Sequence, residues 1–266
     1  MAEDIDSIMN QTIGSVVNKV IVPTAKSEWA SGCLVISIYM DNINPKTIIK
    51  HRAVMAKYNS QGFANLYALT TKTHGETMDL IWTLPELAKF HTIMFLDIDA
   101  VPLCDSALST IFAYAGDSFL VGNAQSSNHI NNGRHMFAAP SALCLSRAMF
   151  ERMGKPSAVP TARGDVGEEY TYCAEELLGT TDNIFLFQPL KYDHPVNRME
   201  WETDRAPTWK LANGKEYGVG TTFGYSNIYT DEDISLPMIW HCFQSFHPGH
   251  QELFWTKCDD LLALKE

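Results

Sequence analysis

The sequence has 266 residues, of which 45% are hydrophobic and 19% are charged, and its formal net charge is −11. This composition is typical of a globular protein that fills a core, and the acidic balance excludes a non-specific nucleic-acid binder, which needs a basic face. No apolar stretch approaches the roughly 18–20 residues of a membrane helix, and the acidic start does not resemble a signal peptide, so we expect a cytoplasmic protein without a transmembrane segment.

A β-α-β-α-β order is predicted behind an N-terminal extension, residues 1–30. The β-branched run of residues 33–40 indicates a strand covered on both faces. A helix is expected next, over residues 44–59. Its signals are Asn44, a good N-cap, and Pro45, a good first helical residue.

The same alternation continues up to residue 96. A second strand is expected at residues 63–71, then a helix over 76–90 that Pro85 kinks or breaks, then an apolar strand at 92–96. Strands that alternate with helices in this way indicate a parallel sheet with helices on its faces. The expected fold class is therefore α/β.

Beyond residue 100 the elements are less regular. A helix capped by Asp105 or Ser106 and ended at Gly116 is expected first. The other expected elements are strands at 118–123, 141–145 and 234–242, a helix over 146–154 and a helix that begins near Glu168, with a turn-rich segment at 190–235.

Two aspartates, Asp97 and Asp99, follow the apolar strand 92–96 directly. A carboxylate is costly to bury unless it is paired or bound to a cation. Ligands of parallel α/β sheets bind beyond the carboxyl ends of the strands, and residues i and i+2 of an extended chain point the same way. The pair therefore predicts a hard oxygen site for Mg²⁺ or Mn²⁺. Exposed aspartates that cap the next helix are the alternative, although Asp105 fits that role better.

The stretch "IMFLDIDAVPL", residues 93–103, resembles the Asp-x-Asp motif of nucleotide-sugar glycosyltransferases of the GT-A fold. The segments "NGRHMFAAPSALCLSRAMFERMG" and "GDVGEEYTY" are similar to later segments of that family. The resemblance covers roughly residues 33–255. It implies a Rossmann-like, mostly parallel sheet flanked by helices, and the transfer of a sugar from a UDP- or GDP-sugar donor to a hydroxyl of a carbohydrate or other acceptor.

Within this resemblance the chain would form one catalytic domain, residues 31–266. Residues from about 31 to 125 would be its nucleotide-binding half, and residues from about 126 to 266 its more irregular acceptor half.

The resemblance also implies a metal site. The family binds Mn²⁺ or Mg²⁺ and the donor diphosphate at the motif, here Asp97, Ile98 and Asp99. Members often take a third metal ligand from a histidine near the C-terminus. His241, which follows an apolar strand directly, is the first choice and His247 the alternate; a core histidine with no ligand role remains open.

Further site residues follow from the inferred topology. Ser37, Tyr39 and Asp41, at the end of the first strand, would meet the nucleobase and ribose of the donor. Thr71 and Lys72, which end the second strand, are expected near the nucleotide.

Three acidic residues are candidates for the catalytic carboxylate: Asp165, Glu168 and Glu169. An inverting transfer needs a base that deprotonates the acceptor, whereas in a retaining transfer the same group would position the acceptor. At the start of a helix the dipole keeps such carboxylates ionised. They could equally serve only to favour that helix end.

Two other classes remain as alternatives. "DIDAV" also fits the first motif of haloacid-dehalogenase-type phosphatases. The segment "GDVGEE" of this chain is similar to the last acidic motif of those phosphatases. That last motif should follow an apolar strand, and "VPTARGD" is not one. A non-catalytic sugar-binding module is the other alternative, and it would not need the acidic stretch at 165–169.

Overall fold

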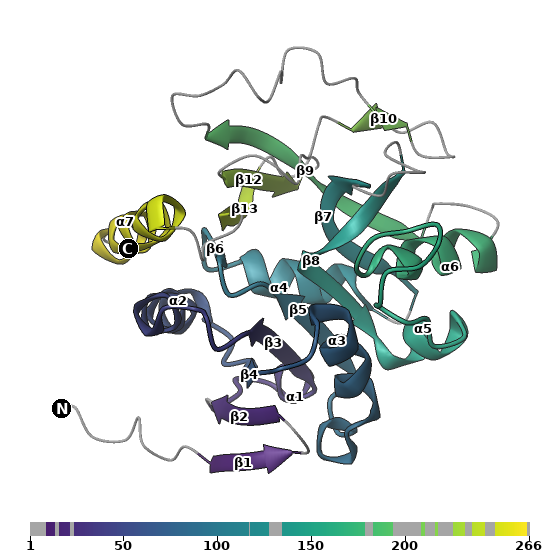
Figure 1. Cartoon of the computed structure of the whole chain (residues 1–266), viewed down its shortest axis with the longest axis horizontal. Coiled ribbons are helices and arrows are strands. Elements are labelled where there is room, and N and C mark those ends of the chain that lie inside the picture. The colour runs from purple at the N-terminus through teal and green to yellow at the C-terminus, as the bar shows by residue number, and fades with distance from the viewer. Residues whose placement is uncertain are drawn as a thin grey trace.

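The structure is a computed structural model. It describes residues 9–13, 16–21, 24–116, 118–127, 135–178, 183–193, 209–210, 216–217, 226–231, 236–242 and 248–264. Within these ranges an eleven-stranded sheet has the strand order β1-β2-β4-β3-β5-β8-β7-β9-β12-β13-β6 (Figure 1). None of the helices in the described part is long and apolar enough to cross a membrane.

Six strands form the centre of the sheet: β4 (Ala64–Leu69), β3 (Cys33–Tyr39), β5 (Thr92–Leu96), β8 (Met136–Ser146), β7 (Leu120–Ser126) and β9 (Ile184–Asp193). Strand β3 is parallel to β4 and β5, and β7 is parallel to β9. Strand β8 is antiparallel to both β5 and β7, so it alone of the six is reversed. The predicted mostly parallel α/β sheet is therefore confirmed.

Antiparallel strands extend the sheet at both ends. Strands β1 (Met9–Ile13) and β2 (Val16–Ile21), in the expected N-terminal extension, continue it beyond β4. At the other end β9 is followed by β12 (Ser226–Asp231), β13 (Leu236–Cys242) and β6 (Ala100–Pro102). Strands β10 (Trp209–Lys210) and β11 (Glu216–Tyr217) form a separate two-stranded sheet.

Helices cover both faces of the centre. They are α1 (Glu28–Ser31), α2 (Pro45–Tyr58), α3 (His74–Thr83), the short 3₁₀ helix η1 (Pro85–Leu87), α4 (Ala107–Tyr114), α5 (Arg147–Arg152), α6 (Glu168–Leu178) and α7 (Pro248–Ala263). Leu34 and Ile36 of β3 pack with α3, α5 and α6, whereas Cys33 and Val35 pack with α4. Strand β3 is thus buried on both faces, as its β-branched run predicts.

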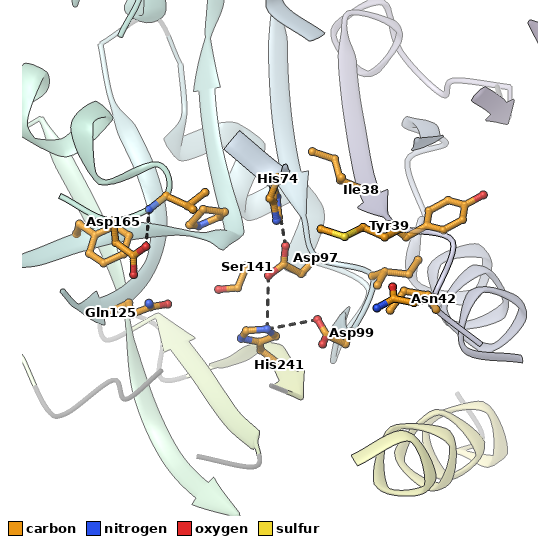
Figure 2. Close-up of a pocket in the computed structure, with 16 residues that line it drawn as sticks. Ile38, Tyr39, Asn42, His74, Asp97, Asp99, Gln125, Ser141, Asp165 and His241 are labelled. Atoms are coloured by element: carbon orange, nitrogen blue, oxygen red, sulfur yellow. Dashed lines mark hydrogen bonds and ion pairs between the residues drawn. The ribbon is translucent and has the colours of Figure 1, made fainter. Parts of the chain in front are cut away.

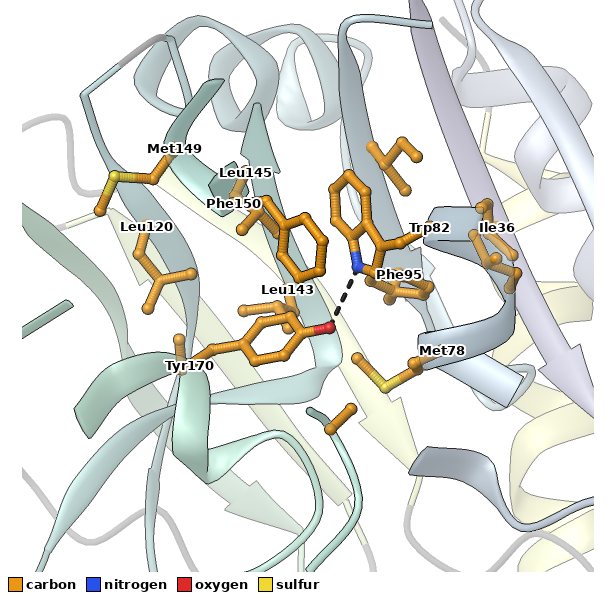
Figure 3. Close-up of a cluster of buried hydrophobic side chains, with 14 of the residues drawn as sticks. Ile36, Met78, Trp82, Phe95, Leu120, Leu143, Leu145, Met149, Phe150 and Tyr170 are labelled. Atoms are coloured by element: carbon orange, nitrogen blue, oxygen red, sulfur yellow. Dashed lines mark hydrogen bonds between the residues drawn. The ribbon is translucent and has the colours of Figure 1, made fainter. Parts of the chain in front are cut away.

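The core on the α3 side is tied together by aromatic side chains (Figure 3). The Trp82 ring stacks on Phe150, with centroids 4.2 Å apart, and its Nε1–H donates to the Tyr170 hydroxyl at 3.0 Å. One buried tryptophan therefore joins α3, α5 and α6, and its polar atom is satisfied.

Local signals set most helix ends. The Asn44 side chain accepts the Lys46 N–H with Pro45 first in α2, as predicted. Thr73 and Glu76 form a capping box, which starts α3 at His74, two residues earlier than expected. Helix α3 ends before Pro85, and Ser106 is the N-cap of α4.

The structure differs from the sequence expectation after the two aspartates. The chain forms β6 before α4, because residues 100–102 find a partner in β13. Strand β9 was not expected, and β8 is longer than the predicted 141–145 segment.

Candidate functional site

The two aspartates lie in a turn between β5 and β6. Ala100 N–H donates to the Asp97 carbonyl at 2.9 Å, Asp97 N–H donates to the Ser141 carbonyl at 3.3 Å, and Cys242 N–H donates to the Asp99 carbonyl at 2.9 Å. The motif is therefore a turn held by β8 and β13, not the extended chain that the sequence suggested.

His241 reaches this turn through strand pairing. Strand β13 runs antiparallel to β6, with His241 opposite Ala100. Its Nε2 lies 3.4 Å from Asp99 Oδ1 and 3.6 Å from Asp97 Oδ2 (Figure 2). The ligand atoms of the three residues lie within 4.8 Å of one another, a spacing at which one metal ion can be bound. The alternate ligand, His247, lies outside the described residues.

A second histidine, which sequence reasoning missed, faces the same carboxylate. His74 Nε2 lies 3.6 Å from Asp97 Oδ1, on the opposite side from His241 (Figure 2). The capping box of α3 puts His74 first in that helix and thereby directs it to the site. A single histidine at a helix start carries no periodic signal, so only the topology reveals it.

The pKa values of Asp97 and His241 are shifted by burial and by each other's charges. Burial raises the pKa of Asp97, His74 and His241 oppose that shift, and Asp99 adds to it. Burial lowers the pKa of His241, but a hydrogen bond with Asp99 and the charges of both aspartates outweigh burial and raise it. The side chain of His241 is only 6% exposed and that of Asp99 12%. Two carboxylates this close in a partly buried place favour a bound cation.

The donor set also fits a particular kind of ion. Carboxylate oxygens suit Mg²⁺ and Mn²⁺, and a single imidazole nitrogen favours Mn²⁺ over the harder Mg²⁺. Asp97, Asp99 and His241 therefore fit Mn²⁺ from the chemistry of their ligand atoms.

The cluster lies in the middle of a cavity of about 370 Å³. One end is formed by the carboxyl end of β3, with Tyr39 and Asn42, and the other by Gln125 and Asp165 (Figure 2). A volume in this range is typical of small-molecule sites.

The sequence-predicted nucleotide residues separate into two groups. Tyr39 and Ile98 line the cavity. Ser37 is buried within β3, and the three others, Asp41, Thr71 and Lys72, are exposed outside the lining. The Thr70 N–H donates to the Tyr39 carbonyl at 3.0 Å, which places the β4 end beside the β3 end.

The three acidic candidates also separate. Asp165 lines the cavity, and its Oδ1 accepts the Val166 N–H at 2.7 Å. Glu168 is fully buried and is bound by Ser127 and His135, outside the lining. Glu169 pairs with Arg163, which holds the pKa of that carboxyl below its usual value.

No protein-family model matches the sequence, and no curated protein matches it. Several solved structures match the chain, among them the following two. The A197 protein of STIV has 12% sequence identity and a TM-score of 0.41, with 71% of this chain and 94% of that chain covered. A mutant Drosophila β1,4-galactosyltransferase 7, in complex with manganese, UDP-Gal and xylobiose, has 14% identity and a TM-score of 0.41, with 68% and 78% covered.

Proposed function

We propose that the protein is a metal-dependent glycosyltransferase that moves a sugar from a nucleoside-diphosphate sugar to an acceptor hydroxyl. The observation that carries this proposal is the cluster of Asp97, Asp99 and His241 at the carboxyl end of a buried strand. The cluster lies between two groups of lining residues, Tyr39 with Asn42 and Gln125 with Asp165, which leaves a place for a second substrate beside the first.

Asp97, Asp99 and His241 would hold Mn²⁺ or Mg²⁺, and the imidazole favours Mn²⁺. A cation there supplies the positive charge that stabilises a departing diphosphate. His74, on the far side of Asp97, lines the same cavity and would donate a hydrogen bond to a phosphate oxygen.

The β3 end of the cavity would bind the nucleotide. Tyr39 offers an aromatic ring for the base, and the Asn42 side chain offers both a donor and an acceptor. Asp41, Thr71 and Lys72 would contact the nucleotide from the outer side of this end. Ser37 is buried inside β3, so it would affect the nucleotide only indirectly, by holding the end of the strand in position.

The opposite end would bind the acceptor, and Asp165, which lines that end, would be the carboxylate that acts there. In an inverting transfer the acceptor oxygen attacks the anomeric carbon, the bond to the diphosphate oxygen breaks, and Asp165 takes the acceptor proton. In a retaining transfer Asp165 would orient the acceptor. Glu168 and Glu169, which do not line the cavity, would not take the place of Asp165.

Titration with UDP and GDP, each with and without Mn²⁺, tests the proposal by thermal shift and calorimetry. We expect one nucleotide to raise Tm only when Mn²⁺ is present. No response to either nucleotide, together with hydrolysis of a generic phosphate ester, would instead support the phosphatase alternative. Against that alternative, residues 155–167 before α6 contain no strand.

A further inference from the structure

A fully buried carboxylate, that of Glu168, lies behind the acceptor end of the cavity. Its Oε2 accepts the Ser127 hydroxyl and the Asp165 N–H, each at 2.7 Å, and its Oε1 lies 2.6 Å from His135 Nδ1. A buried carboxylate is tolerated only with such partners. All of these partners come from outside α6, so Glu168 joins separate segments of the chain.

His135 is the counter-ion of this carboxylate. Its Nε2 lies 3.4 Å from Glu175 Oε2, and its ring stacks on Tyr172 with centroids 4.0 Å apart. Burial lowers the pKa of His135, but Glu168 and Glu175 outweigh burial and raise it. Each imidazole nitrogen thus faces a carboxylate oxygen, an arrangement that favours the protonated ring.

The segments that Glu168 joins are those that form the acceptor end. Gln125 and Phe137 line the cavity, and each lies two residues from a partner of Glu168, Ser127 and His135 respectively. The third partner is the backbone of Asp165 itself. One side chain thus holds the end of β7, the start of β8 and the loop that carries the acceptor carboxylate.

We propose that Glu168, paired with His135, is a positioning residue that fixes Asp165 and the acceptor end of the cavity without touching the substrate. This inference rests on the proposed function, because it assigns Asp165 to the acceptor. A purely structural role would lower stability only, whereas positioning predicts a selective loss in the transfer step with the donor end unchanged.

The test replaces Glu168 with Gln, a change that keeps the shape and removes the charge. The matched control is Glu176→Gln, which alters an exposed carboxylate of the same helix that pairs with Arg163. Three quantities are measured: the Tm increase with UDP or GDP and Mn²⁺, the NMR pKa of His135, and nucleotide release from UDP-glucose, UDP-galactose and GDP-mannose with water or methyl glycosides as acceptors.

For Glu168→Gln we expect unchanged nucleotide and Mn²⁺ binding, a lower pKa of His135, and release slowed by about tenfold or more, as when a supporting contact to a reacting group is lost. The Glu176→Gln control should match the wild type in all three. Ser127→Ala, which removes one hydrogen bond and keeps the ion pair, should slow release in the same direction by a smaller factor.

The outcomes separate the two proposals. Release by Glu168→Gln and Ser127→Ala at wild-type rates, with binding intact, would overturn the positioning role. A wild-type protein that neither binds nucleotide with Mn²⁺ nor releases it would overturn the proposed function instead. In that case an unchanged pKa of His135 in Glu168→Gln would also remove the physical basis of the positioning role.

Discussion

Asp97 lies between two histidines, with His74 near one carboxylate oxygen and His241 near the other. Asp99 contacts only one of them, His241, among the ion pairs of the described residues. The two aspartates therefore have different surroundings although they belong to one short motif. Asp97 is therefore the residue through which the proposed binding of a cation would affect both histidines.

The double substitution Asp97→Asn and Asp99→Asn should abolish the Mn²⁺-dependent Tm increase with nucleotide and leave the fold intact. Asn keeps the shape and removes the charges that bind the cation. In the wild type, ligand at 100 times its Kd stabilises by about 2.7 kcal/mol, and the variant should lose this increment. Asp105→Asn, an exposed aspartate near the motif, is the control. A retained Mn²⁺ response in the double variant would refute the metal site.

The His135 pair predicts a pH dependence of stability. The folded-state pKa of His135 is raised above its ordinary value of 6.5 by the facing groups Glu168 and Glu175. A raised pKa stabilises the fold fully below the ordinary value, and this contribution is lost as the pH rises through the folded-state pKa. The stability difference between wild type and His135→Gln should thus be larger at about pH 6 than at about pH 9.

The measurement is urea unfolding of both proteins at the two pH values. Breaking a buried ion pair costs about 3–5 kcal/mol, so the difference at the lower pH should be readily resolved. Equal differences at both pH values would show that the imidazole is not held as a cation. The stacked partner, Tyr172, is retained in both proteins.

At the scale of elements, the site depends on how α3 begins. Thr73 Oγ1 accepts the Glu76 N–H at 3.3 Å, and Glu76 Oε2 accepts the Thr73 N–H at 2.9 Å. This box sets the first turn of α3, and the first residue of that turn is His74.

Thr73→Ala should therefore destabilise the protein by about 1 kcal/mol, the usual effect of a lost N-cap. It should also weaken nucleotide binding, because His74 loses its fixed position. Thr83→Ala, at the other end of the same helix, should cost less than about 0.5 kcal/mol. Chemical denaturation measures the first effect and calorimetry the second; equal costs for the two variants would contradict the role of the box.

Local signals predicted some elements and missed others for a physical reason. Strand β3, helix α2 with its Asn44 cap and the break at Pro85 all follow from residues close in sequence. Strand β6 has three residues, and it forms only because β13 pairs with it from far along the chain. No pattern of residues close to β6 in the sequence predicts that pairing.

The same distinction applies to the site. Asp97 and Asp99 could be singled out because an apolar strand that ends in two carboxylates is unusual. His241 could be singled out because it comes at the end of an apolar segment, and the structure places it within β13. Glu168 was expected among the catalytic groups, and its burial depends on Ser127 and His135, which lie 41 and 33 residues away. The sequence contains all three residues, but it does not reveal that they are in contact.

At the scale of the whole molecule, the cavity lies where the direction of the strands in the sheet changes. The end of the cavity with Tyr39 and Asn42 lies at the carboxyl end of β3, in the parallel part, and the Asp97 turn contacts β8, the reversed strand. The alternation of strands and helices predicts the parallel part because short right-handed connections leave few other arrangements. The antiparallel part depends on long-range pairings and was not predictable in the same way.

The pairing of β6 with β13 has a consequence for synthesis of the chain. Residues 97 and 241 are 144 positions apart (241 − 97 = 144). At about 5–20 residues per second, the ribosome adds the histidine roughly 7–30 s after the aspartates. During that interval the first strands and helices can fold, while the histidine of the Asp97, Asp99 and His241 cluster is still missing. We therefore expect the proposed cation site to be complete only late in the synthesis of each molecule.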